Sequence, residues 1–170
     1  MADISAEPSD VGKAIAKEAG RIVEDATYSS KGHFEAAKNW DNWHLRIGIP
    51  TTVVAAIAGV SAIKDSPTLA AALAFLVAAA SGLSTFLDAK GNAAAHLQAG
   101  NAYKALQSDA RIFVEIDCKS DPSVPDLRKH LNDLNARRNA LNTSSPQIPR
   151  SAFERARRGI EAGEAKYRVD

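Results

Sequence analysis

The sequence predicts an all-α protein: a two-helix transmembrane hairpin with long cytosolic helices that form a bundle or a coiled-coil-like assembly. The 41 residues from Ile47 to Leu87 contain only two charged side chains, whereas the other 129 residues contain 39. Outside this segment, apolar residues recur at steps of three and four, the period of an amphipathic helix. The expected parts are 1–46, N-terminal cytosolic helices; 47–87, the hairpin; and 88–170, C-terminal cytosolic helices.

The hairpin is expected from two uncharged runs, 47–63 and 66–87, of 17 and 22 residues. A helix needs roughly 20 mainly apolar residues, within a range of about 17–25, to cross a hydrocarbon core. Neither run has the polar face of a soluble surface helix. Their alanine content keeps a second interpretation open, a buried hairpin in a soluble bundle. A tight turn over Lys64–Pro67 joins the spans, with Pro67 in the first turn of the second helix.

The residues beside the spans predict that both termini lie in the cytoplasm. Three Lys or Arg residues occur in 27–46 and two in 88–107, against Lys64 alone in the turn. Such residues accumulate on the cytoplasmic side. The first ten residues have neither the basic nor the apolar region of a signal peptide. Trp40 and Trp43 precede the first span, where indoles favour the headgroup level, although core positions are an alternative, above all for Trp40.

Small residues at four-residue spacing predict a helix-packing surface on the second span and a shorter one on the first. Such stripes let another helix backbone approach closely in lipid. They serve contacts between subunits or the packing of the two spans of one chain, and the sequence leaves both open. The residues are Ala70, Ala74, Ala78 and Gly82, with Ala55 and Gly59 on the first span.

Hydroxyl groups near the end of the second span are candidates for pore lining. Ser81, Ser84, Thr85 and Asp88 share one side of a helix. Their alternative role is hydrogen bonding to carbonyls of their own helix. The absence of charge inside either run argues against a proton relay, a voltage sensor or an ion-coupled transporter. Two spans enclose no path alone, so a pore requires a homo-oligomer.

Apolar residues at steps of four and three predict an amphipathic helix before the membrane, with Ser9 or Asp10 as its cap. They are Val11, Ile15, Ala19, Ile22 and Ala26. An interruption is expected at Ser29–Gly32. After the second span the helix is expected to continue without a break until Pro122 and Pro125 end it. The candidate packing residues on this continuation are His96, Tyr103, Leu106 and Phe113.

Two further helices are expected towards the C-terminus. Leucines of 127–141 stripe the first, a loop covers 142–149, and Ser151 with Glu154 forms a capping box for the second. The apolar face expected for this last helix is Phe153, Ala156, Ile160, Gly163 and Tyr167. A basic cluster there suits anionic lipid, a nucleotide or a protein partner, or is a solvated face paired through Glu154 and Glu161. Its members are Arg150, Arg155, Arg157 and Arg158.

Patterns of catalysis are not found in the sequence. The four histidines lack metal-ligand spacing, and no phosphate-binding glycine loop or nucleophile elbow occurs. We therefore expect no enzyme, no cofactor and no metal. A balance of 21 Lys and Arg against 20 Asp and Glu argues against nucleic-acid binding. The single cysteine, Cys118, excludes an intrachain disulfide and is expected to be a partly buried apolar residue.

Three segments together resemble the SLATT family of small two-span membrane effectors, which associate with bacterial nucleotide-signalling and SLOG-type sensor proteins. They are NWHLRIGIPTTVV (42–54) with Pro50 inside the first span, STFLDA (84–89), and HLQAGNAYKAL (96–106). The similarity covers about residues 33–115. It implies no catalytic residues, and His96 and Tyr103 are the matches of most interest.

The resemblance implies a homo-oligomeric, pore-forming or membrane-disrupting effector of a bacterial antiviral conflict system. Such an effector acts in the inner membrane, is gated through its cytosolic helices and arrests or kills the infected cell. A nucleotide-signalling or sensor protein is the partner it implies. The alternative is a non-conducting anchor that holds a soluble sensor or nucleotidyltransferase at the membrane.

Overall fold

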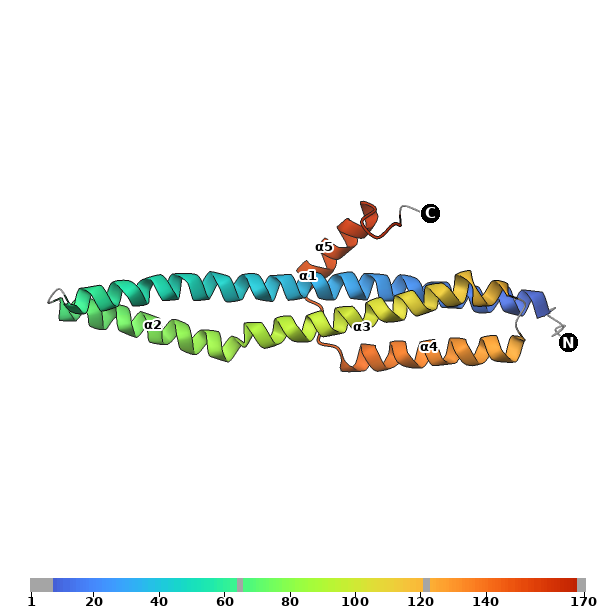
Figure 1. Ribbon diagram of the computed structural model, residues 1–170, viewed down its shortest axis with the longest axis horizontal. Helices are drawn as coiled ribbons and strands as arrows, with labels where there is room; N and C mark the ends of the chain where they lie inside the picture. The colour runs from blue at the N-terminus through green and yellow to red at the C-terminus, as the bar shows by residue number, and fades with distance from the viewer. Residues whose placement is uncertain (1–7, 64–65, 121–122, 168–170) are drawn as a thin grey trace. The chain divides into compact units, whose positions relative to one another are not determined.

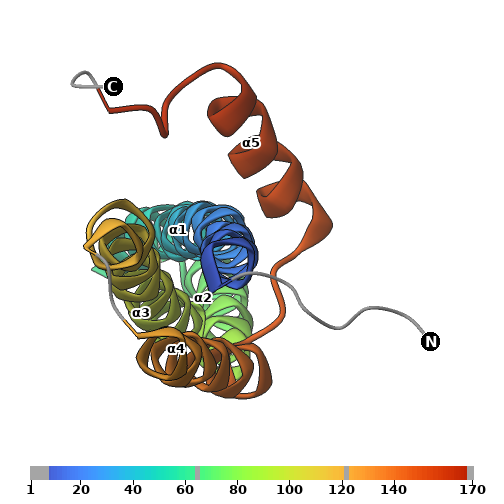
Figure 2. The ribbon, with the colours of Figure 1, turned by 90° about the vertical axis from the view of Figure 1, so that its right-hand side faces the viewer.

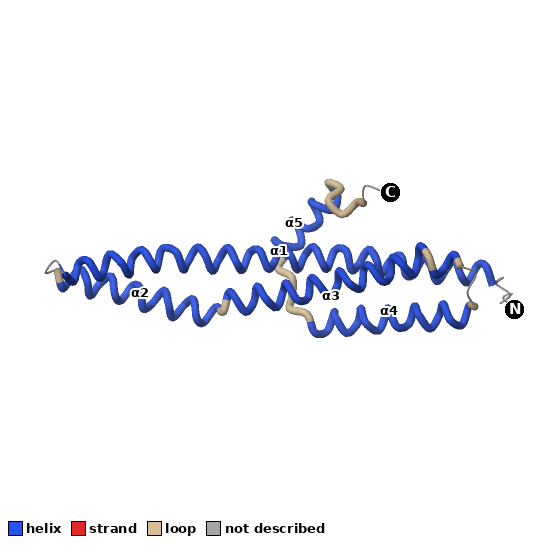
Figure 3. Tube along the Cα trace, viewed as in Figure 1, coloured by secondary structure: helices blue, strands red, loops and turns tan. Residues whose placement is uncertain are grey.

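The computed structural model describes residues 8–63, 66–120 and 123–167, and these are helical almost throughout (Figures 1 and 3). No strand occurs within these ranges, which confirms the all-α class. The helices are α1 (Pro8–Ile63), α2 (Pro67–Leu87), α3 (Ala89–Glu115), the 3-10 helix η1 (Asp117–Lys119), α4 (Val124–Ser144) and α5 (Arg150–Glu161). The expected turn residues Lys64 and Asp65 lie outside the described residues, and Pro67 begins α2 as expected.

The chain divides into two compact units. The core unit contains the described residues up to Glu35 and those from His96 onward. The apolar unit is Ala36–Ala95. It holds the second half of α1, all of α2 and the first turns of α3.

In the core unit, α1, α3 and α4 bury their apolar faces against one another (Figure 2). The expected packing residues Tyr103, Leu106 and Phe113 are at most 3% exposed, and Leu127 and Leu134 of α4 are buried with them. The α1 side of this cluster is Ile15, Ala19, Ile22 and Ala26, the stripe whose spacing indicated a helix. Cys118 is half-buried against the cluster, as expected.

The expected interruption of the first helix at Ser29–Gly32 is wrong, because α1 runs through it unbroken. These residues are inside the core unit: Ser30 is 2% exposed, and a Cβ on Gly32 would lie 3.0 Å from Ile148 Cδ1. Packing of this face therefore outweighs the weak helix propensity of serine and glycine. Ser9 and Asp10 also fall inside α1, which begins at Pro8, rather than in front of it.

The second span and the following helix do not continue without a break, contrary to expectation. Asp88 has φ 40° and ψ 50°, the left-handed conformation, which Asp tolerates better than most residues. Its backbone N–H donates to the Thr85 carbonyl oxygen, and its Oδ1 accepts from the Gly91 N–H at 3.1 Å. One residue thus ends α2 and caps α3.

Three expected boundaries towards the C-terminus are also corrected. The helix after the second span, α3, ends at Glu115, before the prolines, and Pro125 lies in the first turn of α4, where its missing N–H costs nothing. Ser123 caps α4 by accepting from the Asp126 N–H, and α4 extends to Ser144, into the expected loop. Pro149, not Ser151, precedes α5, and no side chain caps it.

The buried face of α5 agrees only in part with the expected one. Ala156 is buried as expected, and Ala152 is buried with it, whereas Phe153 and Tyr167 are 42% and 40% exposed. Gly163 lies beyond the end of the helix with φ 91°. The small side chains of Ala152 and Ala156 let α5 lie close to its neighbours.

Shortening a core leucine should destabilise the core unit. Leu106 is 0% exposed, so Leu106→Ala should lower the free energy of unfolding by about 2–5 kcal/mol. Leu97→Ala is the matched control on the same helix, because Leu97 is 49% exposed, and its effect should stay within about 0.5 kcal/mol. Denaturant unfolding followed by circular dichroism measures both. Equal losses in the two variants would contradict this packing.

Candidate functional site

In the apolar unit, α1 and α2 lie side by side and face each other along a narrow seam (Figure 1). The half-buried residues of α2 recur at alternating steps of four and three, the spacing of a coiled-coil seam. They are Ala70, Leu73, Val77, Ala80, Ser84 and Leu87. The corresponding residues of α1 are Ile47, Thr51, Val54, Ala58 and Ser61.

The small-residue stripe lies mostly outside this seam. Ala74, Ala78 and Gly82 are exposed, as are Ala55 and Gly59 of α1, and only Ala70 belongs to both sets. A four-residue step turns about 40° further round the helix than one full turn, so the stripe drifts away from the partner. A Cβ on Gly59 or Gly82 would meet nothing within 4 Å. The packing of α1 on α2 therefore uses Ala70 but not the other residues of the stripe, which form an exposed surface.

Large apolar side chains cover the rest of the apolar unit. Phe75 and Phe86 are 74% and 87% exposed, and Trp43 is 52% exposed. Two helices of the described chain are long and apolar enough to cross a membrane, and their most apolar windows are only 6% and 0% buried. The core helix of a soluble protein has most of such a window buried. Trp40, by contrast, is half-buried.

The four candidate pore-lining residues lie together at the end of α2, but their hydrogen bonds are local. Thr85 Oγ1 donates to the Ser81 carbonyl oxygen at 3.0 Å. Ser84 lies on the seam with α1, and Asp88 caps α3. The structure thus shows the back-bonding alternative for Thr85 and a structural role for Asp88.

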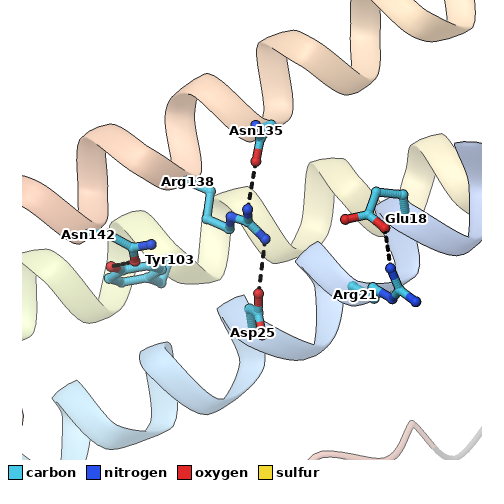
Figure 4. Close-up of polar contacts among 7 residues, drawn as sticks. All are labelled: Glu18, Arg21, Asp25, Tyr103, Asn135, Arg138 and Asn142. Atoms are coloured by element: carbon cyan, nitrogen blue, oxygen red, sulfur yellow. Dashed lines mark hydrogen bonds and ion pairs between the residues drawn. The ribbon is translucent and has the colours of Figure 1, made fainter.

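A buried polar chain crosses the core unit from α1 through α3 to α4. His33 Nδ1 and His96 Nδ1 lie 2.9 Å apart, and these residues are 1% and 3% exposed. The His33 ring stacks on Tyr103 with centroids 5.5 Å apart. Tyr103 Oη in turn donates to Asn142 Oδ1 at 2.7 Å (Figure 4). His96 and Tyr103 were expected to pack; their partner His33 was missed because it follows the expected interruption.

Burial keeps this histidine pair uncharged near neutral pH. Desolvation, with the charge of His96 as a smaller cause, lowers the pKa of His33 to about 4. Desolvation also lowers the pKa of His96 and raises that of Tyr103. Two neutral imidazoles form one hydrogen bond, in which one Nδ1–H donates and the other Nδ1 accepts. Protonation of both would place two donors and two like charges face to face.

The basic cluster of α5 is largely paired. Arg150 Nε lies 2.8 Å from Glu154 and Arg157 Nε lies 2.7 Å from Glu161, which confirms the expected pairing through these glutamates. Arg155 Nε instead contacts Glu35 of α1 at 2.9 Å, and both side chains are about two-thirds buried. Sequence spacing carries no signal for this contact, which links α5 to α1.

A second long-range pair fastens α4 to α1. Arg138 donates from Nη1 to Asp25 at 3.0 Å and from Nη2 to Asn135 at 2.7 Å (Figure 4). The Arg138 side chain is 23% exposed and that of Asp25 is 60% exposed, so water is kept from the arginine but not from the carboxylate. The pair anchors the middle of α4 on α1.

No family model matches the chain, and comparisons with curated proteins and with solved structures find no match. The function therefore has to be inferred from the residues of the chain and their geometry.

The buried histidine pair predicts that stability falls on acidification. Between pH 6.5 and pH 4 the unfolded chain protonates His33 and the folded chain does not, so the unfolded state binds more protons and the free energy of unfolding decreases as the pH falls. Melting temperatures from circular dichroism across this window should show the decrease. His33→Asn should make it shallower, whereas His44→Asn, at an exposed position, should leave it unchanged. A wild-type slope in His33→Asn would refute this account.

Proposed function

We propose that the chain is an integral membrane protein whose two apolar helices cross a bacterial inner membrane with both termini in the cytoplasm. The observation that carries this proposal is the exposure of an apolar surface, at Phe75 and Phe86 above all, on two helical runs, 47–63 and 66–87, that lack charge. Exposure of this apolar surface to water costs free energy, whereas lipid covers it without a protein partner. The positive residues beside the spans support the orientation.

Within that membrane, the proposed protein is a homo-oligomeric, pore-forming effector gated through its cytosolic helices. The open stripe at Ala74, Ala78 and Gly82 supports oligomerisation, because it allows close helix contact and takes no part in the seam within the chain. Two helices surround no path, so conduction requires several copies. The resemblance to the SLATT family supports a role in antiviral defence with a nucleotide-signalling or sensor protein as partner.

The second candidate function is a non-conducting anchor for such a partner. It is favoured by the local hydrogen bonding of Thr85 and Asp88, which leaves few hydroxyls for a polar path. Ion flux from liposomes distinguishes the two functions, since a pore leaks when it is triggered and an anchor does not.

A charge in the middle of α2 tests the membrane proposal against a soluble bundle. Leu76 is 58% exposed, so a soluble protein should tolerate Leu76→Arg within about 0.5 kcal/mol. At the centre of a membrane span the same arginine costs about 2.5–3.5 kcal/mol, and membrane-bound protein should decrease in cell fractionation. Leu97→Arg, at an exposed position of the core unit, is the matched control and should not change the membrane fraction. Recovery of the wild-type chain without detergent in the soluble fraction would exclude the proposal.

A bulky residue in the stripe tests oligomerisation. Ala78→Ile should shift the mass of the detergent-solubilised protein towards the monomer and reduce both liposome flux and depolarisation of cells, and Gly82→Ile should do the same. Ala79→Ile adds the same volume at nearly the same depth about 100° round the helix, also at an exposed position, and should keep the assembly. If Ala78→Ile retains full mass and full toxicity, the stripe is not the contact surface.

A further inference from the structure

A pocket of about 260 Å³ lies in the core unit between α1, α3 and the segment after α5. Its walls carry two aromatic rings, Phe34 and Tyr167, and three lysines, Lys31, Lys104 and Lys166. All of these belong to the same compact unit. The volume is slightly below the range of about 300–1,000 Å³ of drug-sized sites, which favours a small ligand.

Lys104 is the most informative of these residues. Its ammonium donates to two neutral acceptors, Gln107 Oε1 at 2.7 Å and Tyr167 Oη at 3.4 Å. Across the described part of the chain, no carboxylate oxygen lies within the 4.0 Å of an ion pair with Lys104. An ammonium has three N–H donors, so one remains for a ligand. Gln107, which is 5% exposed, fixes the lysine beside the pocket.

The surroundings of Lys104 add positive charge. Lys31 Nζ lies 3.3 Å from Glu164, the one carboxylate among the described residues of the pocket wall, and Lys166 belongs to the same wall. The guanidinium of Arg111 lies 4.9 Å from the centre of the Tyr167 ring, on which it is held by a cation–π contact. Four cations therefore gather around one carboxylate, and they favour an anion with more than one negative charge.

The rings set a second requirement. Phe34 and Tyr167 contribute flat apolar surface beside the lysines. A planar ring gains from contact with such surfaces, and a lysine ammonium forms charge-assisted hydrogen bonds with phosphate oxygens. We propose that this pocket binds a small phosphate ester of a planar ring, with the phosphate on Lys104 and Lys31 and the ring between Phe34 and Tyr167. This site is independent of the proposed membrane function.

The test is isothermal titration calorimetry of the full-length chain in a non-ionic detergent with phenyl phosphate at fixed ionic strength. Phenyl phosphate should bind more tightly than inorganic phosphate, which lacks the ring, and more tightly than phenol, which lacks the charge. Lys104→Met should weaken the binding of phenyl phosphate at least about tenfold, the usual loss in affinity for one hydrogen bond to a charged group. Lys13→Met removes the same charge at an exposed position outside the pocket and should leave the affinity unchanged.

Ring variants separate the two parts of the site. Tyr167→Phe should keep the preference for phenyl phosphate over inorganic phosphate, and Tyr167→Ala should reduce it. Equal binding of phenyl phosphate and inorganic phosphate by the wild type would overturn the ring contact. An equal effect of Lys104→Met and Lys13→Met would overturn the phosphate site. Because Lys104 is exposed, Lys104→Met should keep the fold, and circular dichroism spectra identical to those of the wild type would check this.

Discussion

The structure of this protein depends above all on how its apolar helix surfaces are covered. Between Ile47 and Leu87 the sequence supplies apolar side chains on every side of the helix, and one neighbouring helix covers only a narrow strip of them. Side chains such as Phe86 therefore remain exposed on the surface of the apolar unit. The core unit instead buries its apolar stripes in one cluster, and fewer of its large apolar side chains, such as Ile112 and Ile116, are exposed. The two units therefore differ in how much apolar surface they expose, a difference that the near-neutral net charge of the whole chain does not reveal.

Specific polar contacts join distant segments of the core unit. Arg138 and Arg155 each reach from a late helix to a carboxylate on α1, and each also has one buried nitrogen without a partner in the described structure, Arg138 Nε and Arg155 Nη2. Leaving such atoms unpaired costs free energy, so these pairs fix the register of α4 and α5 more than they add stability. The histidine pair has a similar character, since its one hydrogen bond requires that one of the two Nδ1 atoms stay unprotonated.

Much of this fold was predictable because helical period and charge are local properties. The stripe from Ile15 to Ala26, the α4 leucines and the start of α2 at Pro67 could all be predicted from spacing alone. The positions of helix breaks could not be predicted in this way. Ser30 and Gly32 are residue types common in loops, yet both are buried within α1. Asp88 ends a helix through a left-handed backbone conformation that the helical period does not indicate. The contacts of His33 and Arg155 join residues 63 and 120 positions apart, so no local pattern could indicate them.

The wide sequence separation within the core unit also delays its assembly during synthesis. Asp25 and Arg138 are 113 residues apart, and translation at about 5–20 residues per second separates their appearance by on the order of ten seconds. During that interval the first half of α1 has left the ribosome without the helices that later cover it, while the whole uncharged segment is made. The core unit can therefore be completed only after α4 has been made, and by then both uncharged runs have already been synthesised.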